Sequence, residues 1–549
     1  MAALAVAIDA YFSAQEGYLS RPPDYDGVSY LTYARTPYLL LHSLHLRPAL
    51  HDLIGNISPL WLWVLTTQQL ILGDGTWQAF SARFWAVALL LILVYWIVNR
   101  RATRSLAVAA VGLTALLPLV SAGVRASSLE FLSGQANYVD HWYQDDLRPD
   151  FLAIVLILWS VAALAEHITM PRRSAYLVSA AFAAAAVLAK SSTAPVALAA
   201  WAATLAVSWI WNRRRQDATR MTLVAPIFLV GLLLPWAVFG GGVLTVVTYL
   251  KLIVAQQDTY TSSGGLLGGF TYFLVRIPNE LGPIEAWVVI AGALLMTIAL
   301  LQRRLGREEM IYAALVPLFY IVFSLPPAKN PFVGESISLS IWIFLWAGVA
   351  RIATARWPGP VRRASPYVLA AVSAYTLLVL ALGAFAIVNW PANEQKSNAQ
   401  LSAVTADIAN ELGRHVSAAQ CFAYVPGPGW PASLIYRMMD ANGNAPASTA
   451  IDVVPTQTTV SDYVAAASRC TAVMAYREDI ADVAQVFFAP PIRQPYLRAV
   501  AQWVRSPDSG YALDRTWQFS DLAPSGPHTL GRYQGVSLTV DLYLRGPVT

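Results

Sequence analysis

The feature that most constrains this chain is a succession of apolar runs that continues to about residue 390. Each run is about 17–24 residues long, which lets a helix cross a hydrocarbon layer about 30 Å thick. Charged residues make up only 13% of the 549 residues, about half the fraction of an ordinary soluble domain. We therefore predict a polytopic α-helical membrane protein. The expected spans are 79–98, 105–121, 150–168, 175–191, 194–212, 221–240, 283–302, 309–327, 333–350 and 366–389.

Basic residues lie in tight clusters, and two apolar runs always separate one cluster from the next. The clusters are Arg100, Arg101 and Arg104; Arg172 and Arg173; Arg213, Arg214, Arg215 and Arg220; Arg303, Arg304 and Arg307; and Arg351, Arg356, Arg362 and Arg363. An even number of crossings between clusters places all of them on one side, which the positive-inside rule assigns to the cytoplasm. Parity then requires Met1–Gln15 to be a short or tilted first span. The total is about eleven transmembrane helices.

Residues 16–78 are expected outside the membrane. Tyr30–Leu46 mixes leucines with Arg35 and two histidines, a pattern typical of an amphipathic helix in the membrane interface. Ile57–Leu72 is predicted to be a second interfacial helix, because treating it as a span would invert every later cluster. The segment 1–390 thus forms one membrane domain with interfacial helices at its outer face.

The last span runs outward, so residues 391–549 are predicted to form an extracytoplasmic α/β domain. Its expected helices are Leu401–His415, Ser433–Met439, Ser461–Ser468 and Tyr496–Val504, and its expected strands are Cys421–Val425, Ala472–Tyr476 and antiparallel segments within Tyr511–Leu544. Two cysteines in an oxidising compartment favour a Cys421–Cys470 disulfide, and two buried thiols are the alternative.

Two acidic residues are expected at the outer membrane boundary. Asp24 and Asp26 follow the first span, in the sequence Arg21-Pro-Pro-Asp-Tyr-Asp-Gly-Val-Ser-Tyr30. Carboxylates beside a membrane are costly to desolvate and gather at functional sites. The plainer interpretation is a solvated polar turn.

Four local patterns resemble the GT-C superfamily of membrane glycosyltransferases, in its bacterial protein mannosyltransferase-like and lipid A aminoarabinose transferase-like branch. That branch has Asp-Glu and then Tyr, four residues after the Asp, in its first outer loop; here Asp26 and Tyr30 match, and Gly27 replaces the second acid. The other matches are Ser58-Pro-Leu-Trp-Leu-Trp63 with Leu72-Gly73 and Ala82-Arg83, Arg148-Pro-Asp150-Phe-Leu152, and Leu188-Ala-Lys190-Ser191. A further lysine stands in Pro326-Pro-Ala-Lys329-Asn330.

This resemblance implies transfer of a sugar from a polyprenyl-phosphate donor to a hydroxyl of a glycan, lipid or protein acceptor. Asp26 is then the expected general base, with Asp24 in reserve, because a hydroxyl nucleophile must lose its proton as it attacks. The leaving phosphate needs cations at the membrane boundary, and Lys190, Lys329 and Arg83 are the candidates. A lysine at a helix end also snorkels for structural reasons alone.

Other residues have open alternatives. Asp150 either pairs with Arg148 as a structural salt link or helps to hold the acceptor or a metal. Arg148 and Asp150 are both candidates to bind the acceptor or the sugar. Tyr30, Tyr138 and Trp142 are candidates to stack on sugar rings, although interfacial aromatics need no ligand. Asp140, His141, Asp145 and Asp146 either bind a divalent ion or form a hydrated acidic loop. Glycine pairs in 241–282 predict a mobile flap over the donor, or a merely flexible loop.

The predicted location is the bacterial cytoplasmic (inner) membrane, and the predicted partners are a polyprenyl-phosphate-linked sugar, its acceptor and membrane lipid. No charge block indicates a nucleic-acid partner. No cofactor is certain, and a divalent metal is a possible one. A transporter or lipid flippase and a non-catalytic envelope scaffold are the rival functions. A transporter is expected to have polar, broken helices near the bilayer midplane, whereas the ionisable residues here lie at the ends of the predicted spans.

Overall fold

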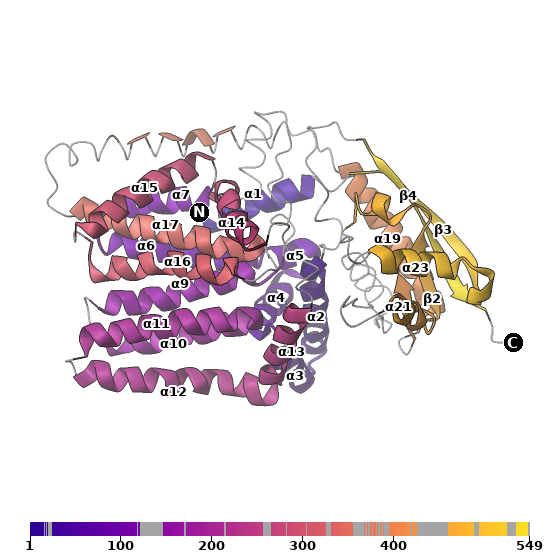
Figure 1. The fold of residues 1–549 in the computed structure, drawn as a ribbon, viewed down its shortest axis with the longest axis horizontal. Helices are drawn as coiled ribbons and strands as arrows, with labels where there is room; N and C mark the ends of the chain where they lie inside the picture. The colour runs from indigo at the N-terminus through magenta and orange to yellow at the C-terminus, as the bar shows by residue number, and fades with distance from the viewer. Residues whose placement is uncertain are drawn as a thin grey trace.

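The structure of the chain is a computed structural model. It describes residues 1–15, 17, 19, 25–117, 119–120, 147–168, 172–213, 216–255, 265–281, 283–302, 305–325, 331–354, 395–417, 420–424, 459–487, 494–523 and 534–546, with isolated positions between 367 and 388. Long helices pack side by side at one end of the molecule, and a small sheet with its own helices lies at the other (Figure 1).

The predicted spans are helices. They are α1 (Ala2–Gln15), α6 (Arg83–Asn99), α7 (Arg104–Ala115), α9 (Asp150–His167), α10 (Arg173–Ala189), α11 (Ala194–Asn212), α12 (Gln216–Phe239), α15 (Pro283–Leu301), α16 (Arg307–Ser324) and α17 (Pro331–Thr354). Within the described residues, five helical segments are long and apolar enough to cross a membrane: Thr76–Asn99, Asp150–His167, Ser191–Asn212, Gln216–Phe239 and Gly334–Thr354. Most of the expected span 366–389 lies outside the described residues.

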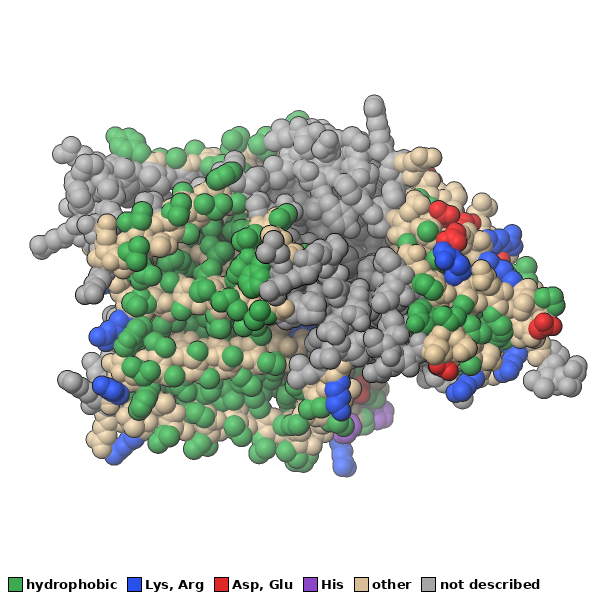
Figure 2. Space-filling model, viewed as in Figure 1, with side chains coloured by type: hydrophobic (Ala, Val, Ile, Leu, Met, Phe, Trp, Pro, Cys, Tyr) green, Lys and Arg blue, Asp and Glu red, His purple; other side chains and the backbone are tan. Residues whose placement is uncertain are grey.

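The long helices also expose many hydrophobic side chains on the surface of the bundle. Hydrophobic side chains cover the visible face of the bundle, and lysine and arginine side chains gather at its left end (Figure 2). On α12, Ile227 and Phe239 are among the exposed large hydrophobic residues, as expected where the neighbouring phase is lipid rather than water. The arginines at that end follow α6, precede α7 and α10, and begin α16. The clustering predicted from the sequence is therefore present on one side of the bundle.

Short helices run across the opposite end of the bundle (Figure 1). They are α2 (Tyr25–His42), α3 (Leu46–Ile54), α4 (Pro59–Leu72) and α5 (Thr76–Phe80). The predicted interfacial helix 30–46 instead begins at Tyr25 and breaks at Leu44, whose positive φ of 62° ends α2 before α3 begins. Trp236 near the end of α12 donates a hydrogen bond to the Asn56 carbonyl at 3.2 Å. This bond joins the layer of short helices to a long helix.

The prediction of a loop across 241–282 was wrong for most of its length. Residues Gly242–Ala255 form α13 and Gly265–Leu281 form α14. The glycines Gly268 and Gly269 lie inside α14, where each costs only about 1 kcal/mol relative to alanine. The apolar face of α14 packs on α15, α16 and α17, and the Tyr320 hydroxyl on α16 donates a hydrogen bond to the Phe270 carbonyl at 2.6 Å. Tertiary packing therefore outweighs the local glycine signal.

The C-terminal part has a separate hydrophobic core, between Ile408 and Tyr543. It contains α19 (Gln395–His415), β1 (Phe422–Tyr424), α21 (Val460–Ala467), β2 (Ala472–Tyr476), α22 (Ile480–Val483), α23 (Gln494–Val504), β3 (Tyr511–Leu522) and β4 (Val536–Arg545). The strand order is β1-β2-β4-β3; β1 and β2 are parallel, and the other two pairs are antiparallel. This part thus combines helices with a small sheet. The expected helix 433–439 lies outside the described residues.

The expected disulfide is present. Cys421 and Cys470 are bonded, with their Cα atoms 4.7 Å apart, and they precede the paired strands β1 and β2. The bond closes a loop across a sequence separation of 49 residues. It therefore ties the edge strand β1 covalently to its parallel neighbour β2.

Candidate active site

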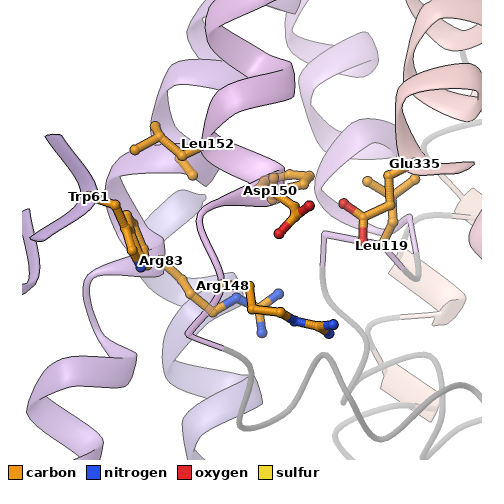
Figure 3. A pocket seen from close by; sticks show the side chains of 9 residues that line it. Trp61, Arg83, Leu119, Arg148, Asp150, Leu152 and Glu335 are labelled. Carbon is orange, nitrogen blue, oxygen red and sulfur yellow. The ribbon is translucent and has the colours of Figure 1, made fainter. Parts of the chain in front are cut away.

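A small pocket opens at the end of the bundle that carries the short helices (Figure 3). Its lining comes from α4, α6, α9, α17 and the segments before α9 and after α7. The lining residues are Trp61, Arg83, Ala86, Leu119, Arg148, Asp150, Phe151, Leu152 and Glu335. Three residues predicted from the sequence to act on the substrate, Arg83, Arg148 and Asp150, therefore meet in one cavity.

Helix ends place these groups at one level. Arg83 is the first residue of α6, Asp150 is the first of α9, Lys190 directly follows α10, and Glu335 lies in the first turns of α17. A charged side chain at the end of a spanning helix reaches the polar boundary without entering the hydrocarbon. The alternation of apolar runs and polar ends in the sequence thus brings distant residues to a common depth.

Asp150 and Lys190 form a buried ion pair. The Lys190 ammonium donates to both carboxylate oxygens of Asp150 at 2.5 Å, and the two side chains are 10% and 5% exposed for Lys190 and Asp150 respectively. The predicted Asp150–Arg148 salt link is not among the ion pairs of the described residues, and Lys190 provides the cation instead. The pair joins the ends of α9 and α10 at the pocket, and the ammonium neutralises the charge of Asp150.

Arg83 and Arg148 put two guanidinium groups next to one another at the pocket (Figure 3). Arg83 lies over the Phe80 ring, with its Cζ 5.3 Å from the ring centroid. Its Nη1 atom is buried and has no hydrogen-bond partner among the described residues. A buried N–H donor without an acceptor costs free energy, so this arrangement favours binding of an anion.

Trp61 and Glu335 are site residues that the sequence analysis did not select. The buried Trp61 donates from Nε1 to the Leu147 carbonyl at 2.5 Å, which holds the segment carrying Arg148 against α4. Glu335 is 2% exposed, and its carboxylate faces Asp150 across the pocket (Figure 3). The signal for Glu335 was available, because it is the only acidic residue within the predicted span 333–350.

The other site residues predicted from the sequence lie outside the described residues or away from the pocket lining. Asp26 lies in the first turn of α2, but its side chain is outside the described set. Four other predicted residues lie wholly outside the described residues: Asp24, Lys329, Tyr138 and Trp142. The acidic loop residues Asp140, His141, Asp145 and Asp146 are also outside them. Tyr30 is buried in the core of the bundle and does not line the pocket.

A second group of buried charges lies at the opposite end of the bundle. Arg101 contacts Glu166 and Glu308 at 2.5 Å each and Glu309 at 3.1 Å. Arg100 also reaches Glu166, at 3.2 Å. These contacts join the ends of α6, α9 and α16 and contain no residue of the pocket. We call this group the Arg101 cluster.

One group of potential metal ligands occurs among the described residues, and it lies in the C-terminal part. Glu411, His415 and Asp514 bring one ligand atom each within 4.8 Å of one another. Glu411 also accepts hydrogen bonds from Arg414 at 3.0 Å and Arg515 at 2.6 Å. Two guanidinium groups on the same carboxylate disfavour an added cation. We therefore treat this group as an ion-pair network.

Comparison with solved structures identifies the fold. The chain is similar to ArnT from Cupriavidus metallidurans bound to undecaprenyl phosphate, with a TM-score of 0.53 and 14% sequence identity over 99% of this chain and 98% of that chain. It is also similar to the apo state of that protein, with a TM-score of 0.50 and 14% identity over 98% and 97% of the two chains. No protein-family model and no curated protein sequence matches the chain. The GT-C resemblance inferred from the sequence is thus confirmed at the level of the fold.

Proposed function

On the ArnT-like GT-C fold that this chain shares, we propose that it is a membrane glycosyltransferase that moves a sugar from a polyprenyl-phosphate donor to an acceptor hydroxyl. The observation that carries the proposal is the pocket with two adjacent arginines at the ends of apolar helices. The similar ArnT structure has undecaprenyl phosphate bound. A phosphate at the head of a long hydrocarbon chain fits a cationic pocket that borders the bilayer.

Arg83 and Arg148 are proposed to bind the donor phosphate. A guanidinium presents a planar fork of N–H donors that matches phosphate oxygens, and Arg83 has a buried donor atom available. The negative charge on the phosphate grows as the bond to the sugar breaks. Fixed cations therefore stabilise the transition state more than the ground state.

Asp26 is proposed as the general base. The acceptor oxygen attacks the anomeric carbon, its proton passes to the Asp26 carboxylate, and the bond from the anomeric carbon to the phosphate oxygen breaks with the electron pair leaving on the phosphate. The position of Asp26 at the start of α2, in the layer of short helices, supports this role. Asp150 is a poorer candidate because the Lys190 ammonium already binds both of its oxygens.

Lys190 and Lys329 are both predicted from the sequence to bind the donor phosphate. The contact with Asp150 supports a positioning role for Lys190, in which it neutralises a carboxylate that would otherwise repel the phosphate. Lys329 remains a proposed phosphate ligand on the strength of its sequence position alone.

Binding of undecaprenyl phosphate tests the donor site. Purified protein in phosphatidylcholine nanodiscs should bind this lipid, and Arg83→Ala and Arg148→Ala should each weaken binding about tenfold or more, as expected for loss of a charge-assisted hydrogen bond. Arg173→Ala is the matched control, because that side chain is 73% exposed at the other end of the bundle. Equal affinities in all four proteins would refute the assignment of the pocket.

Transfer from a radiolabelled polyprenyl-phosphate sugar tests the reaction. Asp26→Asn should lower transfer by about 100-fold or more while undecaprenyl phosphate still binds, because loss of a general base removes that much rate. Asp52→Asn on α3 controls for loss of an acid in the same layer. A transporter or flippase would bind the lipid but transfer no label to any acceptor, in the wild type as in the variant.

The location and orientation form part of the proposal. We place the arginine-rich end of the bundle in the cytoplasm, so that the pocket, the short helices and the C-terminal α/β domain (391–549) face the extracytoplasmic side. The disulfide between Cys421 and Cys470 is consistent with an oxidising compartment. Cysteine accessibility to a membrane-impermeant maleimide, measured on single added cysteines at Arg173 and Asp52, tests this orientation.

A further inference from the structure

Trp61 lines the pocket, and the reaction proposed above gives it no task. It lies in the first turn of α4, which Pro59 begins, and it is 1% exposed. Its indole N–H donates to the Leu147 carbonyl at 2.5 Å, and Leu147 directly precedes Arg148. In Figure 3 the indole lies beside Arg83. This buried bond therefore connects a short helix to the segment that carries one of the two proposed phosphate ligands.

The two arginines of the pocket are held in different ways. Arg83 is the first residue of α6, so the helix itself fixes the place of its backbone. Arg148 stands two residues before the start of α9. The carbonyls on either side of it accept hydrogen bonds, one from Trp61 and one, at 2.9 Å, from the backbone N–H of Ala153. The second bond belongs to α9 itself, so α4 supplies the outside support for this part of the pocket.

The beginning of α4 is bonded to two further parts of the bundle. The Ile57 carbonyl accepts from the backbone N–H of Ser191 at 3.3 Å, in the turn after α10. The Asn56 carbonyl accepts from the indole of Trp236 at 3.2 Å, near the end of α12. Three separate elements thus converge on residues 56–61. A helix start that is fixed at several points gives the indole bond a rigid base, as precise placement of a binding group requires.

We infer that Trp61 is a positioning residue that holds Arg148 where it meets the donor phosphate. The inference rests on the proposed function and adds a residue that acts on the phosphate through another. Without the indole N–H, the buried Leu147 carbonyl loses this partner, and the segment gains freedom to leave its place. The guanidinium is then in position for part of the time, and the apparent affinity for the phosphate falls by that fraction.

Binding of undecaprenyl phosphate in phosphatidylcholine nanodiscs tests the inference. Trp61→Phe keeps an aromatic ring and removes the N–H, and it should weaken binding roughly three- to tenfold, the factor expected for one net hydrogen bond. Trp159→Phe is the matched control. The Trp159 indole donates to the Leu89 carbonyl at 2.9 Å and joins α9 to α6 away from the pocket lining. This variant loses a bond of the same kind and should bind the lipid as the wild type does.

A double-mutant cycle determines whether the effect passes through Arg148. In an Arg148→Ala background, Trp61→Phe should cause no further loss of affinity, because the group that it positions is gone. In an Arg83→Ala background, Trp61→Phe should still weaken binding by about threefold or more. A general loosening of the fold would act equally in both backgrounds, so the comparison separates positioning from a purely structural role.

Three results would overturn the inference. They are wild-type affinity in Trp61→Phe, an equal loss of affinity in Trp159→Phe, and a Trp61→Phe effect that persists undiminished in the Arg148→Ala background. An Arg148→Ala protein that binds the lipid as tightly as the wild type would refute the phosphate site as well. A weakened Arg148→Ala protein beside an unaffected Trp61→Phe protein would overturn this inference alone.

Hydrogen exchange of the wild type provides a measurement that does not depend on folding of the variant. A support that exists before the ligand arrives should protect the backbone amides of residues 147–153 equally with and without undecaprenyl phosphate. Protection that develops only after the lipid is added would mean that the ligand orders this segment, and the inference would be wrong.

Discussion

The ion pair between Lys190 and Asp150 provides the sharpest test of the structure. Substituting Lys190 with methionine keeps most of the side-chain volume and removes the ammonium. The Asp150 carboxylate, 5% exposed, would then be buried without the cation that binds both of its oxygens. The double variant Lys190→Met with Asp150→Leu removes both charges and leaves an apolar contact between α9 and α10.

The magnitudes follow from burial. Breaking a buried pair from one side costs about 3–5 kcal/mol, because an uncompensated charge remains, whereas replacing both partners with apolar groups is often close to neutral. Asp150 is also the first residue of α9, where the helix dipole favours a carboxylate by about 0.5 kcal/mol. We therefore expect Lys190→Met to lower the midpoint of thermal unfolding by roughly 5–8 °C. The double variant should recover most of this loss.

Differential scanning fluorimetry of the detergent-purified protein measures these midpoints, and undecaprenyl phosphate binding is measured on the same samples. The double variant should bind the lipid nearly as well as the wild type if Lys190 serves to neutralise Asp150. Loss of binding in a well-folded double variant would mean that Lys190 holds the phosphate itself. A single variant as stable as the wild type, or a double variant no better than the single, would refute the reasoning.

Three further outcomes are expected. Arg101→Met should lower the unfolding midpoint by roughly 5 °C and leave undecaprenyl phosphate affinity unchanged, because the cluster contains no pocket residue; a weaker affinity would contradict this separation. Removal of the disulfide by Cys421→Ser with Cys470→Ser should cost the C-terminal domain about 4 kcal/mol for a loop of this length, measured by urea unfolding with a tryptophan fluorescence signal. Burial alone would raise the pKa of Glu411, but hydrogen bonds, first that from Arg515, outweigh it and lower the pKa. The pKa in the folded state therefore lies below the unfolded value of about 4.3. The stabilisation that ionised Glu411 contributes is present above that pH and is lost as the pH falls through the folded value. Glu411→Gln should flatten the dependence of unfolding free energy on pH between about pH 3 and pH 6.

The spans were predictable because one physical requirement, a bilayer thickness of apolar helix, dictates them locally. The span 194–212 coincides with α11, and the ends of α9 and α15 lie within a residue of the predicted limits. The prediction of a loop for the glycine-rich stretch 241–282 was wrong because α14 is stabilised by packing on its neighbours rather than by its own sequence. Propensity is a weak guide where packing decides.

The site was predictable only in part, for a related reason. Charged residues at helix ends can be assigned to a side of the membrane from parity, which selected Arg83, Asp150 and Lys190. Their partners depend on which helices are neighbours, and the pairing of Asp150 with Lys190 rather than with Arg148 follows from the packing of α9 on α10. Glu335 comes from a helix far along the chain, and no local pattern links it to Arg83.

The Arg101 cluster has a mechanical consequence for the bundle. It fastens α6, α9 and α16 at the end away from the pocket, so relative tilting of these helices must pivot about that point. Displacement then grows with distance from the pivot and is largest where the pocket opens. Such a lever would concentrate relative motion of these three helices at the pocket end while the bundle as a whole stays assembled.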